Sequence, residues 1–221
     1  IGYGDPSSAY VVRDAADKIV ATIRFNEQVL GPLLSPDGTR LLGSVYRRGP
    51  EETLGGIRFA GKPMLSTGVF DLTGREVVSI VGYDDSVWAP DGKLISTGSL
   101  YGPGLFEVDP GTKKVTPIDA KIGCPLQPSV SPDGKTVAFV TGGKVWLIGR
   151  DGTNLRQLLR DGKPQQKPVF SPDGTKVAFV ICTAISNDLT GEVFVFDLKT
   201  QELTPLRTST GASLVPDTTS R

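Results

Sequence analysis

Two adjacent carboxylates, Asp84 and Asp85, follow the aromatic Tyr83 in a segment between two predicted strands. Adjacent carboxylates in a loop can bind a hard cation or act as an acid and a base. The structural alternative is a solvated turn, because charged side chains are mostly exposed. We treat these three residues as candidate binding residues, and we predict no catalytic set and no metal site.

Basic and aromatic candidates lie in two further segments. Arg47, Arg48 and Arg58 belong to an insertion, and their guanidinium groups could clamp an anionic partner through charge-assisted hydrogen bonds. Tyr101 could serve as an exposed aromatic that recognises a partner. The alternative for the arginines is solvation at the surface, and the alternative for the tyrosine is covering a sheet edge.

The two cysteines, Cys124 and Cys182, do not have the spacing of a metal site. They could pair in a disulfide, which would imply an oxidising compartment, or remain two buried thiols. The chain contains no histidine, which excludes Ser-His-Asp triads and His-containing zinc sites. We expect no cofactor.

The overall composition narrows the class of protein. The 221 residues carry 24 basic and 24 acidic side chains, so the chain is neutral, and without a basic block we expect no nucleic-acid partner. The longest apolar stretch, residues 177–185, is shorter than the about 20 residues that span a membrane, so we predict no membrane-spanning segment. The 27 glycines and 17 prolines accompany 38% hydrophobic residues, which indicates many short elements rather than disorder.

These candidates are held by secondary-structure elements, and one recurring tetrapeptide indicates what those elements are. Its copies are Ser35-Pro36-Asp37-Gly38, Ala89-Pro90-Asp91-Gly92, Ser131-Pro132-Asp133-Gly134 and Ser171-Pro172-Asp173-Gly174. Consecutive copies are 54, 42 and 40 residues apart. Proline presets φ at the second position, aspartate tolerates the backbone conformation of the third, and glycine supplies the positive φ of the fourth. Each copy therefore predicts a type I turn with a glycine bulge. The four aspartates are therefore predicted to be turn residues between two strands, a and b, and not catalytic groups.

A second set of turns begins with aspartate and lies at residues 71–74, 109–112, 151–154 and 197–200. Apolar runs on both sides of each turn predict two more strands, c and d, and residues 9–24 contain one further c–d pair. Four antiparallel strands about every 40 residues are typical of β-propeller blades. A β-sandwich is the alternative, but its inequivalent strands would not need one tetrapeptide at a near-constant interval.

The sequence thus predicts an all-β fold, a β-propeller of four-stranded antiparallel blades, with four complete blades plus a partial fifth. The expected blade segments are residues 9–24, 32–81, 87–118, 128–159 and 168–206. We expect residues 1–221 to form a single β-propeller domain or a fragment of a larger propeller. Trp88 and Trp146 align with apolar residues of the other repeats and are predicted to pack between blades.

The strand order assigns the connections to two faces. The a–b and c–d turns leave one face, called here the short-turn face, and the b–c and d–a connections leave the opposite long-loop face. Binding residues concentrate in loops held by rigid scaffolds, so we expect a ligand site on the long-loop face. The expected long loops are residues 26–31, 46–63, 82–86, 98–104, 120–128, 161–167 and 183–190.

The recurring tetrapeptide, followed by Lys or Thr and an apolar strand, resembles the WD-like repeats of TolB-type propellers. The segment from Asp151 to Leu158, Asp-Gly-Thr-Asn-Leu-Arg-Gln-Leu, is similar to the TolB pattern at a c–d turn. Related blades occur in the propeller domains of prolyl oligopeptidase-type peptidases. The resemblance covers about residues 33–206, and it implies a rigid module that docks a protein or another macromolecule.

Three functions remain open from the sequence. The favoured one is a non-catalytic scaffold that binds a protein partner through the long-loop face, with a preference for a periplasmic or extracellular location. The second is a propeller enzyme that acts on carbohydrate with two carboxylates about 5–10 Å apart, and the candidates are Asp84, Asp85, Asp119 and Asp188. The third is the accessory propeller of a larger peptidase.

Overall fold

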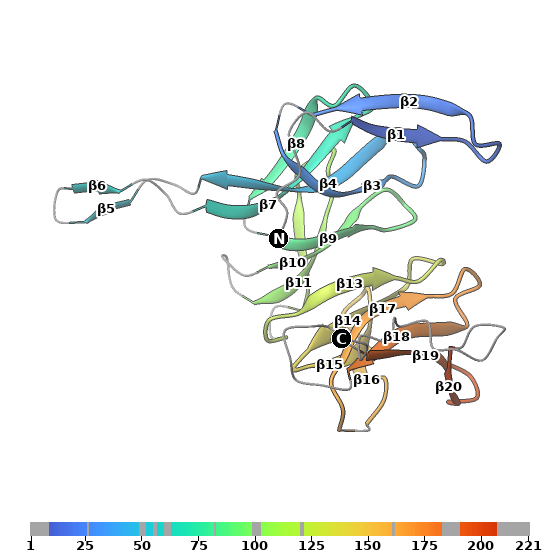
Figure 1. Ribbon diagram of the computed structural model, residues 1–221. Coiled ribbons are helices and arrows are strands. Elements are labelled where there is room, and N and C mark those ends of the chain that lie inside the picture. Colours follow the sequence, from blue (N-terminus) through green and yellow to red (C-terminus); the bar gives the residue numbers. More distant parts are fainter. Residues whose placement is uncertain are drawn as a thin grey trace, which may run out of the picture.

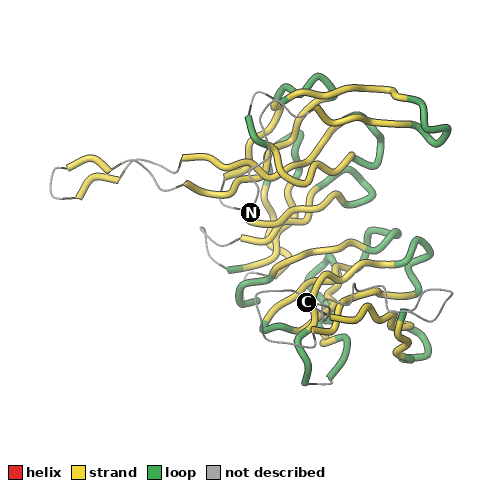
Figure 2. Tube along the Cα trace, viewed as in Figure 1, coloured by secondary structure: helices red, strands yellow, loops and turns green. Residues whose placement is uncertain are grey.

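The computed structural model describes residues 9–25, 27–48, 52–54, 57–59, 63–81, 83–98, 103–119, 122–160, 162–182 and 191–206. Every regular element in these ranges is a β-strand, as Figures 1 and 2 show. Consistent with this, no described segment is a helix that could cross a bilayer. The all-β prediction is therefore confirmed.

The strands form four sheets of four antiparallel strands, each in simple sequence order a-b-c-d. Blade 1 consists of β3 (Val29–Leu34), β4 (Arg40–Arg48), β7 (Pro63–Asp71) and β8 (Glu76–Val81). Blade 2 consists of β9 (Tyr83–Trp88), β10 (Leu94–Gly98), β11 (Gly104–Val108) and β12 (Val115–Asp119). Blade 3 consists of β13 (Leu126–Val130), β14 (Thr136–Thr141), β15 (Lys144–Gly149) and β16 (Arg156–Gln157). Blade 4 consists of β17 (Gln165–Phe170), β18 (Lys176–Cys182), β19 (Gly191–Asp197) and β20 (Leu203–Pro205).

Two smaller sheets complete the description. The partial blade pairs β1 (Ala9–Arg13) with β2 (Ile19–Arg24), and a separate hairpin pairs β5 (Glu52–Leu54) with β6 (Ile57–Phe59). The partial blade has the c–d turn chemistry of the complete ones, because the Asp14 carboxylate accepts the backbone N–H groups of Ala16 and Lys18. The prediction of four complete blades plus a partial fifth is confirmed.

The recurring tetrapeptide forms the expected turn. In its first copy the Ser35 hydroxyl donates to Asp37 Oδ1 at 2.6 Å, and the Thr39 N–H donates to the same oxygen at 3.0 Å. Gly38 has a φ of +71° and donates its N–H back to the Ser35 carbonyl, which closes the turn. The predicted structural role of the turn aspartates is therefore confirmed at this copy.

Hydrogen bonds from the turn also explain the electrostatics of its carboxylate. The Ser35 hydroxyl, and then the N–H and hydroxyl of Thr39, lower the pKa of Asp37 to about 2. The same donors in the fourth copy, Ser171 and Thr175, lower the pKa of Asp173 to about 2. These donors prefer a charged acceptor, so they stabilise the carboxylate form.

Four buried clusters hold the blades together, and each cluster joins two consecutive sheets. Neighbouring residues of strand b point to opposite faces, so Leu41 contributes to the cluster with the partial blade and Leu42 to the cluster with blade 2. The b strands of blades 2 and 3 are likewise buried on both sides. Blade 3, for example, lies between Ile95 of blade 2 on one side and Phe179 of blade 4 on the other.

The tryptophans lie where the repeat predicted them. Trp88 packs in the cluster between blades 1 and 2, and its indole N–H donates to the Leu33 carbonyl of blade 1 at 3.1 Å. Trp146 packs in the cluster between blades 2 and 3. No buried cluster of the described residues joins the partial blade to blade 4, and Figure 1 shows these two sheets at opposite ends of the stack.

Several expected loops turn out to be strand, which corrects the predicted boundaries. Strand a begins at Val29, Tyr83, Leu126 and Gln165, two to four residues earlier than expected in each blade. Tyr83, Asp84 and Asp85 therefore belong to β9 and not to a loop. These stretches are polar or contain proline, so they lack the apolar alternation that predicts a strand, but their backbone still pairs with strand b. The expected loop at residues 183–190 lies outside the described residues.

Candidate functional site

Three equivalent residues on the first strands of blades 2, 3 and 4 connect these blades in series. Asp85, Gln127 and Lys167 each lie six positions before the turn aspartate of their repeat, on the adjacent strands β9, β13 and β17. The Gln127 N–H donates to Asp85 Oδ2 at 3.0 Å, and the Lys167 N–H donates to Gln127 Oε1 at 2.7 Å. We call these three residues the inner row.

A repeated β-bulge gives the inner row its geometry. Gln127 and Lys167 both have a φ of +52°, and the strand register shifts beside each of them. Each is followed by a proline, Pro128 and Pro168, which has no N–H to give to the ladder. The equivalent residue of blade 1 is Gly31, which also has a positive φ but no side chain that could reach the next blade.

Blade 2 departs from this pattern because Ser86 stands where the other blades have proline. The register there is regular from Asp85 to Trp88, with Asp85 paired to Thr97 and Ser86 to Ser96, and it shifts just before Asp85, between Thr97 and Gly98. The Ser86 hydroxyl shares hydrogen bonds with the hydroxyls of Thr67 at 2.9 Å and Ser96 at 2.7 Å. Ser96, Thr97 and Thr67 are almost fully buried, so this hydroxyl cluster anchors the start of β9 and with it Asp85.

The inner row presents three different polar groups on one line. Asp85 contributes a carboxylate, Gln127 a side-chain amide whose N–H₂ has no described partner, and Lys167 an ammonium that forms no ion pair with the described residues. Lys167 is exposed, whereas Asp85 and Gln127 are half-buried. Since all three lie near the beginning of strand a, they belong to the long-loop end of the blades.

The predicted binding residues are distributed over three places. Arg47 and Arg48 end β4 and Arg58 lies in β6, and the side chains of these arginines lie outside the described part of the structure. The same holds for the side chains of Tyr83 and Asp84, which begin β9.

Tyr101 lies outside the described residues altogether, so Asp85 is the predicted binding residue whose contacts are known. The described residues contain no group of three or more His, Cys, Asp or Glu side chains that could hold a metal ion.

Both cysteines are free thiols in the structure. Cys182 is buried at the end of β18, and Cys124 is exposed before β13 with a φ of +33°. Of the two sequence-based alternatives, a disulfide or two thiols, the structure has the thiols, although only Cys182 is buried.

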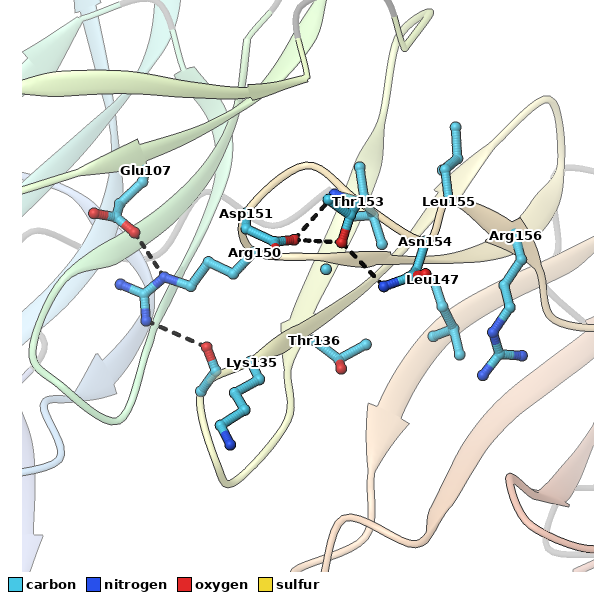
Figure 3. A pocket seen from close by; sticks show the side chains of 13 residues that line it. Glu107, Lys135, Thr136, Leu147, Arg150, Asp151, Thr153, Asn154, Leu155 and Arg156 are labelled. Carbon is cyan, nitrogen blue, oxygen red and sulfur yellow. Dashed lines mark hydrogen bonds and ion pairs between the residues drawn. The ribbon is translucent and has the colours of Figure 1, made fainter.

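A hollow of about 990 Å³ lies on the short-turn side of blade 3 (Figure 3). Its most buried charged group is Arg150, which reaches across to blade 2. Arg150 Nε donates to Glu107 Oε2 at 2.7 Å, and Nη2 donates to Asp91 Oδ2 at 2.8 Å. Lys93 Nζ donates to the other Glu107 oxygen at 2.5 Å. Sequence analysis missed this network, which we call the Arg150 clamp.

The charges of the Arg150 clamp neutralise one another. Partial burial acts to raise the pKa of Glu107, but hydrogen bonds from Lys93 and Arg150 outweigh it and hold that pKa below its ordinary value. The pKa of Asp91 is lowered in the same way, against the effect of burial, by Arg150. In this copy Ala89 replaces the turn serine, so Asp91 receives no hydrogen bond from a hydroxyl at that position. The hollow therefore contains a blade-to-blade contact whose charged groups are already engaged.

Sequence reasoning also missed Gln127 and Lys167. A signal for them exists, because aligning the four tetrapeptides puts Gly31, Asp85, Gln127 and Lys167 in one column, before proline in three of four cases. The column does not show by itself that its residues touch. That contact depends on how adjacent blades are placed.

No family model matches the sequence. A protein named TolB homolog, from Chlorobium luteolum, is 31% identical over 117 residues, which are 51% of this chain and 26% of that protein. The crystal structure of TolB from Acinetobacter baumannii superposes with a TM-score of 0.60 and 21% identity, over 90% of this chain and 52% of that one.

Two enzymes have a similar fold. An oligogalacturonate lyase in complex with manganese superposes with a TM-score of 0.58 and 23% identity, over 90% of this chain and 58% of the lyase. A puromycin hydrolase superposes with a TM-score of 0.57 and 19% identity, over 81% of this chain and 28% of the hydrolase. The aligned region is thus less than two thirds of each of these proteins. Together with the blade order and the turns, the comparisons confirm the resemblance seen in the sequence: this chain has the fold of a TolB-like β-propeller.

Proposed function

We propose that this chain is a non-catalytic scaffold that binds a protein partner through its long-loop face, in a periplasmic or extracellular setting. The observation that carries the proposal is the inner row. It places an acceptor, an amide and a cation in series across three sheets that are packed rigidly together. A segment of polypeptide offers the complementary donors, acceptors and carboxylates.

Backbone strain at the inner row supports the same proposal. A residue other than glycine in the left-handed region costs about 1–2 kcal/mol, and Gln127 and Lys167 both adopt this conformation. Strain of this kind persists where the surroundings impose it, and it concentrates at binding sites. Lys167 has no described side-chain partner that would account for its own conformation.

The relatives agree with a binding role and leave two alternatives to be tested. The sequence relative carries the name TolB homolog, which favours a periplasmic protein-binding role. The likeness to an oligogalacturonate lyase and to a puromycin hydrolase extends to the fold. The carbohydrate-enzyme alternative needs a second carboxylate about 5–10 Å from Asp85, whereas the hydrogen bonds of Asp85 to described residues involve Thr97 and Gln127.

The proposal is tested by capturing partners from periplasmic, secreted and cytoplasmic fractions of the source cells. The bait variants are Lys167→Glu, which replaces the cation of the inner row with an anion, and Lys135→Glu, which reverses an exposed charge on the short-turn side. We expect a periplasmic or secreted protein to bind the wild-type chain and the Lys135→Glu variant, and to be captured at least tenfold less by Lys167→Glu. Equal capture by the two variants would show that the long-loop face is not the binding face.

The enzyme alternative is tested on the same proteins. Wild-type chain and Asp85→Asn, which keeps an acceptor for the Gln127 N–H, are incubated with oligogalacturonates and with peptide amides. Turnover that is present in the wild type and lost in Asp85→Asn would replace the scaffold with an enzyme. Detection of the chain in source cells as part of a larger polypeptide with a peptidase domain would instead favour the accessory propeller.

A further inference from the structure

Strands β4 and β7 extend beyond the blade to which they belong. Each has nine residues, whereas strands b and c of the other blades have five to seven. The neighbouring strands β3 and β8 pair only as far as Val45 and Ser66. Pairing between β4 and β7 continues from there to Arg48 and Pro63. Beyond the blade, the ribbon therefore has two outer edges that no described strand covers.

The ribbon leads to the hairpin of β5 and β6. Two residues connect these strands, because Leu54 pairs with Ile57, and Figure 1 shows the hairpin at the far end of an arm that leaves the blades. We call the described residues of this ribbon and hairpin, 46–48, 52–54, 57–59 and 63–65, the arm. No described strand pairs with the outer edge of β5 or of β6. A two-stranded hairpin by itself is marginally stable in water, and free strand edges are templates for another strand.

Charge distinguishes the two edges of the arm. Residues 47–62 contain four basic and two acidic residues, in a chain whose net charge is zero. Of the charged residues in the two hairpin strands, Glu52 belongs to β5 and Arg58 to β6. The β6 side also contains Ile57 and Phe59, which favour strands.

We propose that the arm binds an extended, acidic segment of a protein partner, which adds as a third strand along the outer edge of β6. Strand addition of this kind draws its affinity from main-chain hydrogen bonds and its selectivity from the neighbouring side chains. Opposite charges on facing strands stabilise the pair, so an acidic segment fits this edge better than a basic one. The inference rests on the proposed binding role and names the kind of segment that is bound.

The register identifies which backbone groups are free to pair. In an antiparallel hairpin with a two-residue connection, the residues that flank the connection exchange ladder hydrogen bonds with each other. The next pair directs its N–H and C=O groups outward, and here that pair is Thr53 and Arg58. Arg58 therefore offers its N–H on the β6 edge, and Thr53 offers its N–H on the β5 edge.

This geometry gives a matched pair of variants. Arg58→Pro removes the outward N–H from the β6 edge, Thr53→Pro removes it from the β5 edge, and neither removes a ladder hydrogen bond of the hairpin. Arg58→Glu keeps the N–H and reverses the charge. The probe is a fluorescein-labelled ten-residue peptide of alternating valine and glutamate, with alternating valine and lysine as its control.

Binding is followed by fluorescence anisotropy at low and at physiological salt, and by hydrogen exchange of the arm. We expect the acidic peptide to bind the full chain at least tenfold more tightly than the basic one and to slow exchange at residues 57–59. Arg58→Pro and Arg58→Glu should each weaken binding at least tenfold, and Thr53→Pro should leave it within about twofold. Salt should weaken binding, because it screens exposed charges.

Two results would overturn the inference: equal binding of both peptides, or equal losses in Thr53→Pro and Arg58→Pro. Its failure can be told apart from failure of the proposed function by using the arm variants as bait. A natural partner that is lost in Lys167→Glu but retained in Arg58→Pro supports the binding role and contradicts the role of the arm. A partner retained by both variants contradicts both proposals.

Discussion

The turn aspartates show how a single residue type can look like a catalytic group and act as a structural one. Eight of them have a pKa below the ordinary value, and most owe the shift to serine or threonine hydroxyls and to backbone N–H groups of their own turn. Asp91 is the exception, because Ala89 supplies no hydroxyl and Arg150 takes its place. The turn remains the same, while the carboxylate acquires a partner in the next blade.

Acid should destabilise the protein below pH 4 for this reason. The folded-state pKa of Asp37 and of Asp173 is about 2, below the ordinary value of 3.8. Their stabilising effect is therefore complete above pH 4 and is lost as the pH falls toward 2. Urea unfolding between pH 6 and pH 2.5 measures this loss. In Ser171→Ala, which removes the first donor to Asp173, the folded-state pKa of Asp173 moves back toward the ordinary value, so less stability should be lost in acid than in the wild type. Identical pH profiles for this variant and the wild type would show that the hydroxyl does not set the pKa.

Elements are held to their neighbours by two kinds of contact, apolar clusters between sheets and a few polar connections at the ends. The inner row connects blades 2, 3 and 4 at the long-loop end, and the Arg150 clamp connects blades 2 and 3 at the short-turn end. Beside each connection one residue departs from the repeat. Ser86 replaces a proline beside the inner row, and Ala89 replaces a serine beside the clamp.

The Arg150 clamp should contribute measurably to stability. Arg150→Met leaves Glu107 half-buried with one cation fewer, and Asp91 without its interblade partner. Because hydrogen bonds to charged groups contribute about 1.5–3 kcal/mol each and Asp91 is partly exposed, we expect the free energy of unfolding to fall by about 2 kcal/mol. Urea unfolding at pH 7 measures the change, with Lys135→Met, at an exposed position of the same hollow, as the control within about 0.5 kcal/mol. Equal effects of the two substitutions would argue against a structural role for the clamp.

The molecule as a whole is a stack in which every buried cluster joins two adjacent sheets. In such an arrangement stability is close to a sum of local terms and nearest-neighbour interfaces. Phe70 and Phe179 are both fully buried, one near each end of the stack. They therefore provide a symmetrical test of how far a local defect spreads.

Phe179→Ala should lower stability by about 3–5 kcal/mol, as large-to-small changes in a core do. Hydrogen exchange should accelerate mainly in β13–β20 in this variant, and mainly in β1–β8 in Phe70→Ala. Mass spectrometry of exchanged peptides distinguishes the two patterns. The same uniform acceleration in both variants would mean that the stack unfolds as one cooperative unit.

The blades and their turns can be predicted from the sequence because the residues that determine them are close together in the chain. Proline, aspartate and glycine impose the conformation of the tetrapeptide within four residues, and apolar runs on both sides give four strands to each repeat. Asp85 was found as a candidate for its chemistry, but it was expected in a loop, since a polar strand has no apolar alternation to reveal it. The arginine-rich insertion was likewise expected as a loop and contains β5 and β6.

Contacts between residues about 40 to 60 positions apart were decided by tertiary structure. Whether Gln127 reaches Asp85, or Arg150 reaches Asp91, depends on the packing of one sheet against the next and on a bulge that turns a side chain toward its neighbour. A repeat in the sequence specifies each blade separately, because its turns and strands are stabilised within the blade. The inner row and the interblade bonds of Arg150 exist only after blades have packed, since in each of these bonds the donor lies in one blade and the acceptor in the next.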